Sequence, residues 1–349
     1  MVKSWIAAAV LLLGAGRPGG QAPPPNLPPA IAYGKARHLA DLANRRVNES
    51  SGLACSRIKK DLFWTHNDSG DLPRVYAFDR EGKARGVFQI PNVKARDWED
   101  MASFRTATGA YLVLADVGDN QGKRKSCTIY LAKEPALARP GRAVGKLDVV
   151  RTIRFKYADG PRNCEAVAVD PASRTIYLIG KTGRPPCGVY ALPIAKKGGK
   201  ALAVARRIAA LNVPVVTAMD ISPDGQRCIV LTYGPAVEYR RAPGETWQSA
   251  FKRPGRTLGM PHRRQGESIC YGPDGKGLYL TSEGAPAPLW SVPPVDPKQP
   301  DDAKKAEGVN DVQTPPGPQS RVAPAIPPLH RATQPTRSLA RSLSSPTRR

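Results

Sequence analysis

Residues 165–193 read EAVAVDPASRTIYLIGKTGRPPCGVYALP, which is an apolar strand, a tight turn, a second apolar strand, a polar loop and a third strand. The same order recurs at 217–240 (TAMDISPDGQRCIVLTYGPAVEYR) and at 267–292 (ESICYGPDGKGLYLTSEGAPAPLWSV), and in looser form after residues 51 and 99. Pro-Asp-Gly at 223–225 and 273–275 predicts hairpins between the first two strands. Repeats of roughly 50 residues with up to four short strands are typical of β-propeller blades.

The number of repeats sets the predicted architecture. Short outer strands precede the later repeats, at 86–90 (GVFQI), 152–157 (TIRFKY), 205–211 (ARRIAAL) and 256–260 (RTLGM). The last repeat has no such strand after it, and ARHLADLA at 36–43 is predicted to supply one, because that pairing removes an exposed sheet edge. The sequence therefore predicts an all-β, five-bladed β-propeller closed by an N-terminal outer strand, with a six-bladed propeller as the alternative.

The ends of the chain differ from its centre. Lys3, the apolar run at 5–13, and Gly20 and Ala22 predict a cleaved signal peptide at 1–22, with a membrane anchor as the alternative. A Pro-rich linker is expected at 23–35, the propeller at 36–295 and a disordered basic tail at 296–349, with or without a docking role. The mature protein is expected to be secreted or periplasmic and to have no membrane span.

Charge and cysteine content narrow the partners. The net charge of +24 favours anionic partners, but the Lys and Arg residues are spread along the chain without interleaved aromatics, which argues against nucleic acid. The six cysteines form no CxxC pair, and they allow 15 disulfide connectivities. The sequence does not choose among these, and buried single thiols fit equally well. The cysteines are Cys55, Cys127, Cys164, Cys187, Cys228 and Cys270.

The first residues of the innermost strands form a candidate metal site. In a propeller these strands line the central channel, and their first residues face one end of it. These residues are Ser51, Glu99, Glu165, Thr217 and Glu267. Three carboxylates around one axis repel each other, and a hard cation with oxygen ligands such as Ca²⁺ relieves that repulsion. The alternative is that the glutamates hydrogen-bond to amides of neighbouring blades.

This series of residues resembles the axial site of the calcium-activated nucleotidases, the apyrases of secretory compartments. In that five-bladed family the axial Ca²⁺ is held by a Ser, two Glu, another Ser and a last Glu, so the resemblance implies calcium at these positions, with Thr217 in place of the second Ser. The S-G-L and E-A strand starts also resemble the exported bacterial propellers known as SdiA-regulated. The resemblance covers about residues 36–294, and the family's acidic D-x-D-type segment is absent from residues 23–48.

Polar loop residues surround the predicted channel mouth and supply further candidates. Those expected to act in catalysis are His66, Asp68, Asp116 and Asp119. Those expected to bind a ligand are Asn67, Arg96, Asp97, Asn120, Arg124, Arg162 and Lys181. Carboxylates, one His and several cations together can bind an anionic ligand and activate water. Asn and Asp are also good turn formers, so a purely structural role is the alternative.

Two functions follow from these residues. The first is a calcium-binding propeller that serves as a binding or scaffold module for a small anionic ligand or a protein. The second is a Ca²⁺-dependent hydrolase of phosphate esters or lactones. The sequence contains no G-x-S-x-G, P-loop or H-E-x-x-H motif, so it does not support a serine hydrolase, a P-loop enzyme or a zincin.

Overall fold

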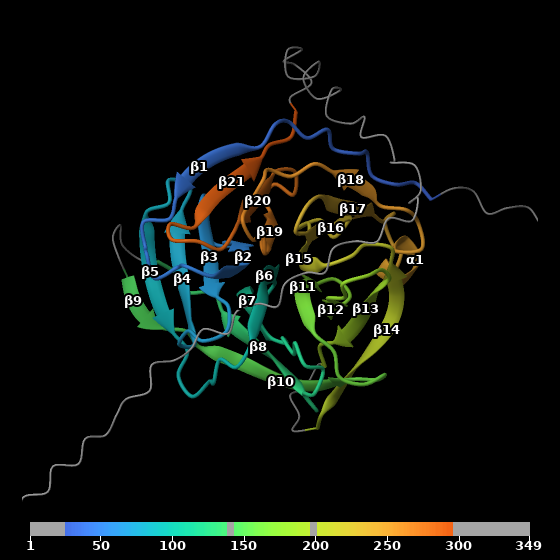
Figure 1. Ribbon diagram of the computed structural model, residues 1–349, viewed down its shortest axis with the longest axis horizontal. Helices are drawn as coiled ribbons and strands as arrows, with labels where there is room; N and C mark the ends of the chain where they lie inside the picture. The colour runs from blue at the N-terminus through green and yellow to red at the C-terminus, as the bar shows by residue number, and fades with distance from the viewer. Residues whose placement is uncertain (1–24, 138–142, 196–200, 296–349) are drawn as a thin grey trace, which may run out of the picture. The chain divides into compact units, whose positions relative to one another are not determined.

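Five strands begin the repeats and pack against one another in a closed cycle (Figure 1). We call them the inner strands: β2 (Ser50–Cys55), β6 (Trp98–Thr106), β11 (Cys164–Asp170), β15 (Val216–Ile221) and β19 (Ser268–Tyr271). Each contacts the next, and β19 contacts β2. The computed structural model describes residues 25–137, 143–195 and 201–295, all within one of the chain's two compact units. The predicted signal peptide (1–22) and basic tail (296–349) lie outside these residues.

Antiparallel strands extend outward from each inner strand. From β2 these are β3 (Leu62–Asn67), β4 (Arg74–Asp79) and β5 (Ala84–Gln89), with β9 (Ala143–Lys146) parallel to β5 at the edge. From β6 they are β7 (Gly109–Asp116), β8 (Cys127–Lys133) and β10 (Val149–Tyr157). From β11 they are β12 (Thr175–Gly180), β13 (Cys187–Pro193) and β14 (Ala203–Leu211). A parallel pairing of β10 with β14 joins these last two groups into one sheet of eight strands.

The remaining two sheets have four strands each. From β15 follow β16 (Arg227–Thr232), β17 (Ala236–Arg240) and β18 (Arg256–Leu258). From β19 follow β20 (Leu278–Thr281), β21 (Pro288–Val292) and β1 (Arg37–Asp41). In this last sheet Arg37 lies opposite Ser291 and Asp41 opposite Pro288 in an antiparallel register. The described residues contain one short helix, α1 (Trp247–Ala250), so the prediction of an all-β, propeller-like fold is confirmed.

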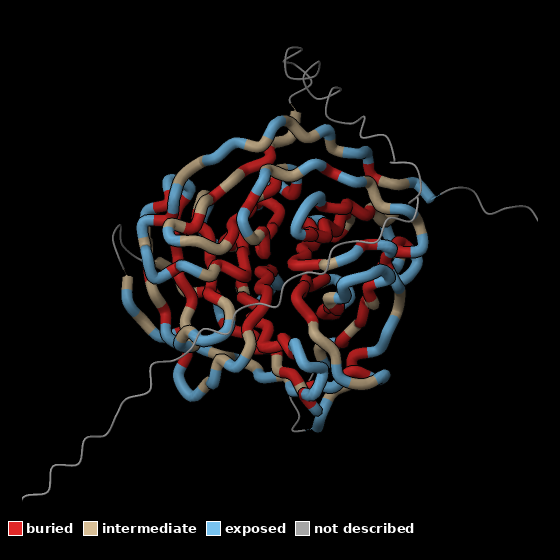
Figure 2. Tube along the Cα trace, in the orientation of Figure 1, coloured by how far each residue is buried: buried red, intermediate tan, exposed pale blue. Residues whose placement is uncertain are grey.

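Apolar side chains fill the spaces between neighbouring sheets. The described core divides into five clusters, and each draws its residues from two consecutive groups of strands. Trp64 on β3 and Trp98 on β6 lie in one such cluster and are fully buried. Burying a large apolar side chain contributes about 1.5–3 kcal/mol. Figure 2 shows the buried residues concentrated on the inner strands and the strands beside them.

The predicted hairpin turns form as expected. At Pro-Asp-Gly 223–225 the amide of Gly225 donates to the carbonyl of Ser222 at 2.7 Å, and Gly225 has a φ of 69°. Gly275 occupies the same position of the second turn with a φ of 68°. Glycine adopts this left-handed conformation without steric cost, which is why the motif ends the first strand of each unit so sharply.

The described part of the predicted linker is docked against the sheet of β15–β18. The carbonyls of Pro28, Pro29 and Ile31 accept hydrogen bonds from the side chains of Arg240, Arg227 and Arg256, at 2.8, 3.2 and 2.6 Å. These carbonyls find their donors in arginine side chains of the neighbouring sheet. The segment therefore has a fixed path to β1.

Two buried aspartates tie the inner strands together. One oxygen of Asp100 accepts from the amide of Met101 at 2.8 Å, and the other accepts from Val167 on β11 at 2.8 Å and from Met219 on β15 at 3.2 Å. Asp220 does the same on a smaller scale, accepting from the amides of Ile221 and Tyr271, both at 2.8 Å. These two aspartates thus fasten the inner strands to one another through backbone amides.

Replacing Asp100 by Asn is expected to lower the free energy of unfolding by about 2–4 kcal/mol, because the amide nitrogen cannot accept from the backbone N–H groups. Chemical denaturation of the purified protein measures this loss. Asp274→Asn is the matched control, since Asp274 is exposed and accepts only turn amides. If the Asp100→Asn variant is as stable as the wild-type protein, Asp100 is not a structural tie.

Candidate metal centre

Four of the five predicted axial residues lie at irregularities in the inner strands, and the fifth, Glu267, directly precedes β19. The β2–β3, β11–β12 and β15–β16 registers each skip one residue, namely Ser51, Glu165 and Thr217. The β6–β7 register shifts between Trp98 and Met101, the interval that contains Glu99. Such β-bulges re-aim the side chain of the extra residue and are common beside functional sites.

The two predicted hydroxyl ligands bind backbone in this structure. Ser51 Oγ donates to the carbonyl of Glu99, and Thr217 Oγ1 donates to the carbonyl of Gly266 at 2.9 Å. Each bond links one inner strand to the start of the next. The hydroxyls therefore hold the spacing of the strands that carry the glutamates, and their remaining lone pairs are directed by these bonds.

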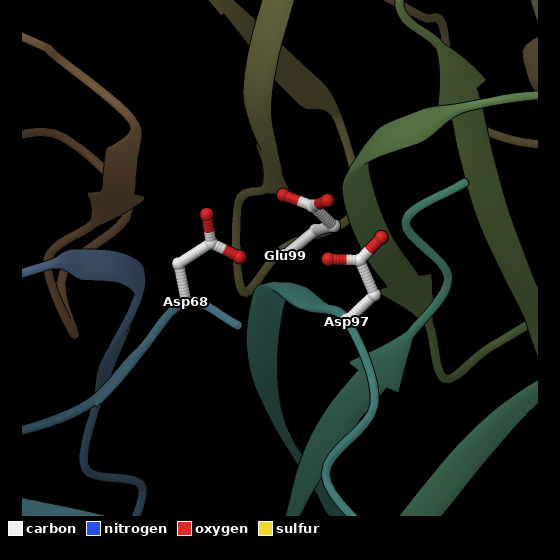
Figure 3. Close-up of side chains that lie close together, drawn as sticks. All are labelled: Asp68, Asp97 and Glu99. Atoms are coloured by element: carbon white, nitrogen blue, oxygen red, sulfur yellow. The ribbon is translucent and has the colours of Figure 1, made fainter. Parts of the chain in front are cut away.

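Carboxylates from loops join the glutamates in two groups of three. Asp68, Asp97 and Glu99 have carboxylate oxygens within 4.8 Å of one another, and so do Asp68, Glu267 and Glu283. Figure 3 shows the first group, with its carboxylates turned toward a common space. Together with Glu165, which hydrogen-bonds to Glu99, these residues form what we call the acidic centre: Asp68, Asp97, Glu99, Glu165, Glu267 and Glu283.

Burial and mutual repulsion perturb these carboxylates. The pKa of Asp68 is raised to about 7, first by burial and then by the charges of Glu267, Asp97 and Glu165. Burial and the neighbouring Glu267 raise the pKa of Glu283 to about 8. Burial and the charge of Glu165 also raise the pKa of Glu99 far above its ordinary value. The folded protein therefore holds negative charge here only at a cost.

On one side of the acidic centre, a lysine and a tyrosine bind two of the glutamates. Lys181 Nζ lies 3.2 Å from Glu165 Oε2 and 2.9 Å from the hydroxyl of Tyr233. Tyr233 in turn donates to Glu267 Oε1 at 2.8 Å, and Asn163 Nδ2 donates to Glu165 Oε1 at 2.8 Å. Lys181, predicted as a ligand-binding residue, thus lies at the acidic centre and neutralises part of its charge.

On the other side, the backbone of Gly118 packs closely against two of the carboxylates. A Cβ built on Gly118 would lie 2.1 Å from Glu99 Oε1 and 2.6 Å from Asp97 Cγ. No side chain fits in that space. Since the φ of Gly118 lies outside the left-handed range, room rather than backbone conformation requires the glycine.

The loop that carries Gly118 is built by several predicted site residues. Asp116 and Arg124 form a buried ion pair at 2.7 Å, and Arg124 Nη1 donates to the carbonyl of Gly118 at 2.7 Å. Asp119 accepts from the amides of Lys123 and Arg124 at 2.9 and 2.7 Å. These side chains shape the wall of the acidic centre.

The same wall is tied to the glutamate of the next inner strand. Asn163 accepts from the amide of Asp119 at 2.8 Å and donates to Asn120 Oδ1 at 3.0 Å. Because Asn163 also binds Glu165, it couples the position of this loop to the acidic centre.

His66 and Asn67 lie elsewhere than the sequence suggested. Both are on strand β3 rather than in a polar loop, and His66 is fully buried. Its Nδ1 bonds the carbonyl of Asn67 at 2.9 Å, and its ring meets Trp98 edge-on at 5.3 Å. Burial lowers the pKa of His66. Asn67 accepts from the amides of Asn48 and Glu49, both at 3.2 Å, and so fastens the segment that precedes β2.

Two predicted ligand-binding arginines are not brought into contact with the carboxylates. Arg162 donates to Asp159 at 2.6 Å, and its guanidinium lies over the rings of Tyr157 and Tyr190 at 5.0 and 4.4 Å. Arg96 is exposed beside Asp97. Tyr157 and Tyr190, which fix Arg162, carry no signal in the sequence that would have revealed that contact.

The sequence predicts other roles for two members of the acidic centre, Asp68 and Asp97. Asp68 was expected in catalysis and Asp97 in ligand binding, whereas the structure places both among the carboxylates that can hold a metal. A usable signal exists for Asp97: it lies two residues before Glu99, so strand periodicity puts both on one face. The need for Gly118 had no signal, because it depends on a contact between two loops.

Comparison with known proteins gives no family for this chain. No protein-family model matches it, and no curated protein matches it. Similar solved structures include a gluconolactonase from Xanthomonas campestris, with 16% identity, a TM-score of 0.42, and coverage of 80% of this chain and 99% of that one. A chain of the nidogen/laminin complex has 14% identity, a TM-score of 0.42, and coverage of 68% and 73%.

At these TM-scores neither likeness bears on the activity of this chain. The resemblance to calcium-activated nucleotidases and SdiA-regulated propellers stays a prediction. Among the described residues, no helix has the length and apolarity needed to cross a membrane.

The stability of the metal-free protein is expected to fall as the pH rises from about 4 to about 8. Asp68 and Glu283 have folded-state pKa values of about 7 and about 8, against ordinary values of 3.8 and 4.5. Within this window the folded state binds more protons than the unfolded chain, so raising the pH removes stability. Melting temperatures across this range in EGTA measure the effect. Asp68→Asn should flatten the slope, and a slope unchanged by Asp68→Asn would contradict the assignment.

Gly118→Ala is expected to weaken divalent-metal binding by about tenfold or more, because the new methyl group displaces the Glu99 and Asp97 carboxylates. Isothermal titration with Ca²⁺ measures the change. Gly183→Ala is the matched control, since nothing lies within 4 Å of a Cβ at Gly183. Equal affinities of the two variants would place the metal away from Gly118.

Proposed function

We propose that this chain is a five-bladed β-propeller that holds one Ca²⁺ at the acidic centre. We propose further that it binds an anionic ligand at the mouth of the channel, beside that centre. The observation that carries the proposal is the convergence of Asp68, Asp97 and Glu99, and of Asp68, Glu267 and Glu283, with carboxylate oxygens within 4.8 Å. Groups of this kind repel each other unless protons or a cation intervene. A binding or scaffold module is the function that these features support best.

The blade count follows from the five inner strands and their sheets. In this proposal each inner strand begins one blade, and β1 completes the last blade by its pairing with β21. The interval between β6 and β11 is the longest, and its extra strand β9 pairs with β5. Among the described strands, that pairing of β9 at the edge of the first sheet supports five blades over the six-bladed alternative.

The donor set favours calcium among common metals. All the candidate ligands are carboxylate oxygens, which suit hard cations rather than Zn²⁺ or Cu²⁺. Ca²⁺ accepts 6–8 oxygens in irregular geometry, whereas Mg²⁺ requires a near-octahedral set. Gly118 lets the loop backbone approach Glu99 and Asp97 closely, which keeps these two carboxylates beside each other.

The ligand class follows from charge. A bound Ca²⁺ would supply a Lewis-acidic position for a ligand oxygen at the mouth of the channel. Lys181, next to Glu165 and Tyr233, adds a second positive group there. The net charge of +24 favours the approach of anions in general. Export to the periplasm or the medium, where Ca²⁺ is abundant, belongs to the same proposal and rests on residues 1–22.

Hydrolysis of a phosphate ester or a lactone is the second candidate, and Asp68 favours it. This side chain is partly exposed and shared by both carboxylate groups, so it can lie beside both a bound cation and a ligand, where a carboxylate can act as a general base. His66, the other predicted catalytic residue, is enclosed on β3 and has no path to such a ligand.

Calcium titration of the chelator-stripped protein tests the proposal. We expect one Ca²⁺ per chain and a melting temperature that rises on binding and falls again in EGTA, because a ligand that binds only the folded state stabilises it. Glu99→Gln should lower the affinity at least tenfold, whereas the exposed Glu81→Gln should not. Absence of calcium binding would mean that shared protons alone hold the carboxylates together, and the proposal and the family resemblance would fall.

A screen of phosphate esters and lactones with calcium-loaded protein then separates the two candidates. Turnover that Asp68→Asn abolishes while calcium remains bound supports the hydrolase. Calcium binding without turnover supports the binding module.

A further inference from the structure

Two cysteines from the two ends of the propeller sequence meet at the seam of the ring. Cys55 is the last residue of β2, and Cys270 lies on β19, the inner strand that packs against β2. Their sulfurs are 3.6 Å apart, and the residues are 215 positions apart in sequence. We propose that Cys55 and Cys270 form a disulfide in an oxidising compartment, which would close the ring covalently. This inference does not depend on the metal.

The contact distinguishes this pair among the six cysteines, all of which lie in the described residues. Cys127 and Cys164 direct their thiols to the carbonyls of Val117 and Ala166, at 3.8 and 3.7 Å. Cys187 meets the hydroxyl of Thr182 at 3.3 Å. Of the sulfur–sulfur contacts among these residues, only that of Cys55 and Cys270 is close enough for a hydrogen bond. The geometry thus favours a single bridge and leaves the other four cysteines as thiols, in place of any of the 15 three-bridge connectivities.

The surroundings fix both cysteines in place. The exposed fractions of Cys55 and Cys270 are 2% and 1%, and both belong to the apolar cluster between the first and last sheets. The carbonyl of Cys55 accepts from Ser103 Oγ at 2.6 Å, and Cys270 is paired with Tyr279 in its sheet. Closing the gap to a bond therefore requires side-chain rotation and a small approach of two strands that already touch.

Formation of the bond follows ordinary thiol–disulfide exchange. The thiolate of one cysteine attacks glutathione disulfide, forms a mixed disulfide and releases one glutathione thiolate. The thiolate of the second cysteine then attacks the mixed disulfide and releases the second glutathione. The protein loses two hydrogens, and one oxidant disulfide becomes two thiols.

Burial determines when this exchange takes place. In the folded ring an oxidant as large as glutathione disulfide cannot reach either sulfur, and burial together with the neighbouring thiol raises the pKa of Cys270. The bond must therefore form during folding, before the first and last sheets close on each other. Once formed, it is shielded from reductants by the same packing.

The link joins strands that also carry the acidic centre. Cys55 lies at the end of β2 remote from Ser51, and Glu267 directly precedes β19. Near that other end the same two strands are held by Ser268 Oγ, which donates to the carbonyl of Ser51 at 2.7 Å. The disulfide would add a second, covalent tie across the seam.

The test is to unfold the reduced full-length chain and refold it with glutathione and glutathione disulfide. We expect an intact mass about 2 Da below that of the six-thiol form, and four thiols available for alkylation in denaturant. Peptide mapping should show one linkage, between the peptides containing Cys55 and Cys270. The oxidised protein should melt about 5 °C or more above protein refolded in dithiothreitol, since a long closed loop is constrained.

Matched variants keep the proposal falsifiable. Cys127→Ala should refold with the same linkage, and Cys55→Ala should show five free thiols and no linkage. If Cys55→Ala does not fold, the peptide map of the unmodified chain decides alone. Six alkylatable thiols after refolding, or a linkage between any other pair, would overturn the proposal. Native reduced protein exposed to glutathione disulfide should stay reduced, and rapid oxidation there would refute the folding-dependent step.

Discussion

The glutamates Glu99 and Glu165 of the acidic centre depend on β-bulges at the starts of the inner strands. A regular strand would alternate its side chains between the two neighbouring sheets and leave none directed along the channel. The skipped residues Ser51, Glu165 and Thr217, and the shift around Glu99, break that alternation. The extra residue is released from the ladder, so its side chain can face the axis while the flanking residues stay in the core. Without these irregularities the same residues would be buried between apolar sheets.

As a result, the adjacent carboxylates Glu99 and Asp100 on β6 have different surroundings. Asp100 accepts hydrogen bonds from three backbone amides of β6, β11 and β15, so the fold itself satisfies its oxygens, although burial raises its pKa. Glu99, one residue earlier, faces Asp68, Asp97 and Glu165 instead of amide donors. A buried carboxylate without such donors is destabilising unless a proton or a cation compensates it. The fold therefore satisfies Asp100 with its own backbone amides. Within the described part of the chain, Glu99 has no such donors and is left to be compensated by a proton or a cation.

Much of this arrangement could be predicted from local patterns. The strands, the Pro-Asp-Gly hairpins and the positions of the inner-strand starts follow from periodicity and turn chemistry, and the structure has strands at those places. The placement of His66 failed because the polar run after it resembles a loop, whereas β3 continues through Asn67. His66 is enclosed beside Trp98 and Gly52, with its Nδ1 bonded to the carbonyl of Asn67, and a single sequence does not reveal such packing.

Long-range contacts account for the rest of what could not be predicted. The parallel pairing of β10 with β14, the parallel strand β9 and the docking of Pro28 to Ile31 all join segments with no shared local signal. Arg162 was expected at the ligand site because it precedes Glu165 closely. Its guanidinium is held instead by two tyrosines and Asp159, which come from other strands and a turn. Side-chain direction at a strand start depends on neighbours that only the fold brings together.

The carboxylates of the acidic centre can be compensated either by protons or by a cation. Cation binding there would therefore depend on pH. Without metal, burial and the neighbouring Glu165 raise the pKa of Glu99, and burial and Glu267 raise that of Glu283, so these carboxyls hold their protons more tightly. A divalent cation would take the place of those protons, so its binding must release them. Lys181 compensates Glu165 in either state, whereas Asp68 has no cationic partner among the described residues and joins both groups. Asp68 is therefore the carboxylate that the two groups share and that no described cation compensates.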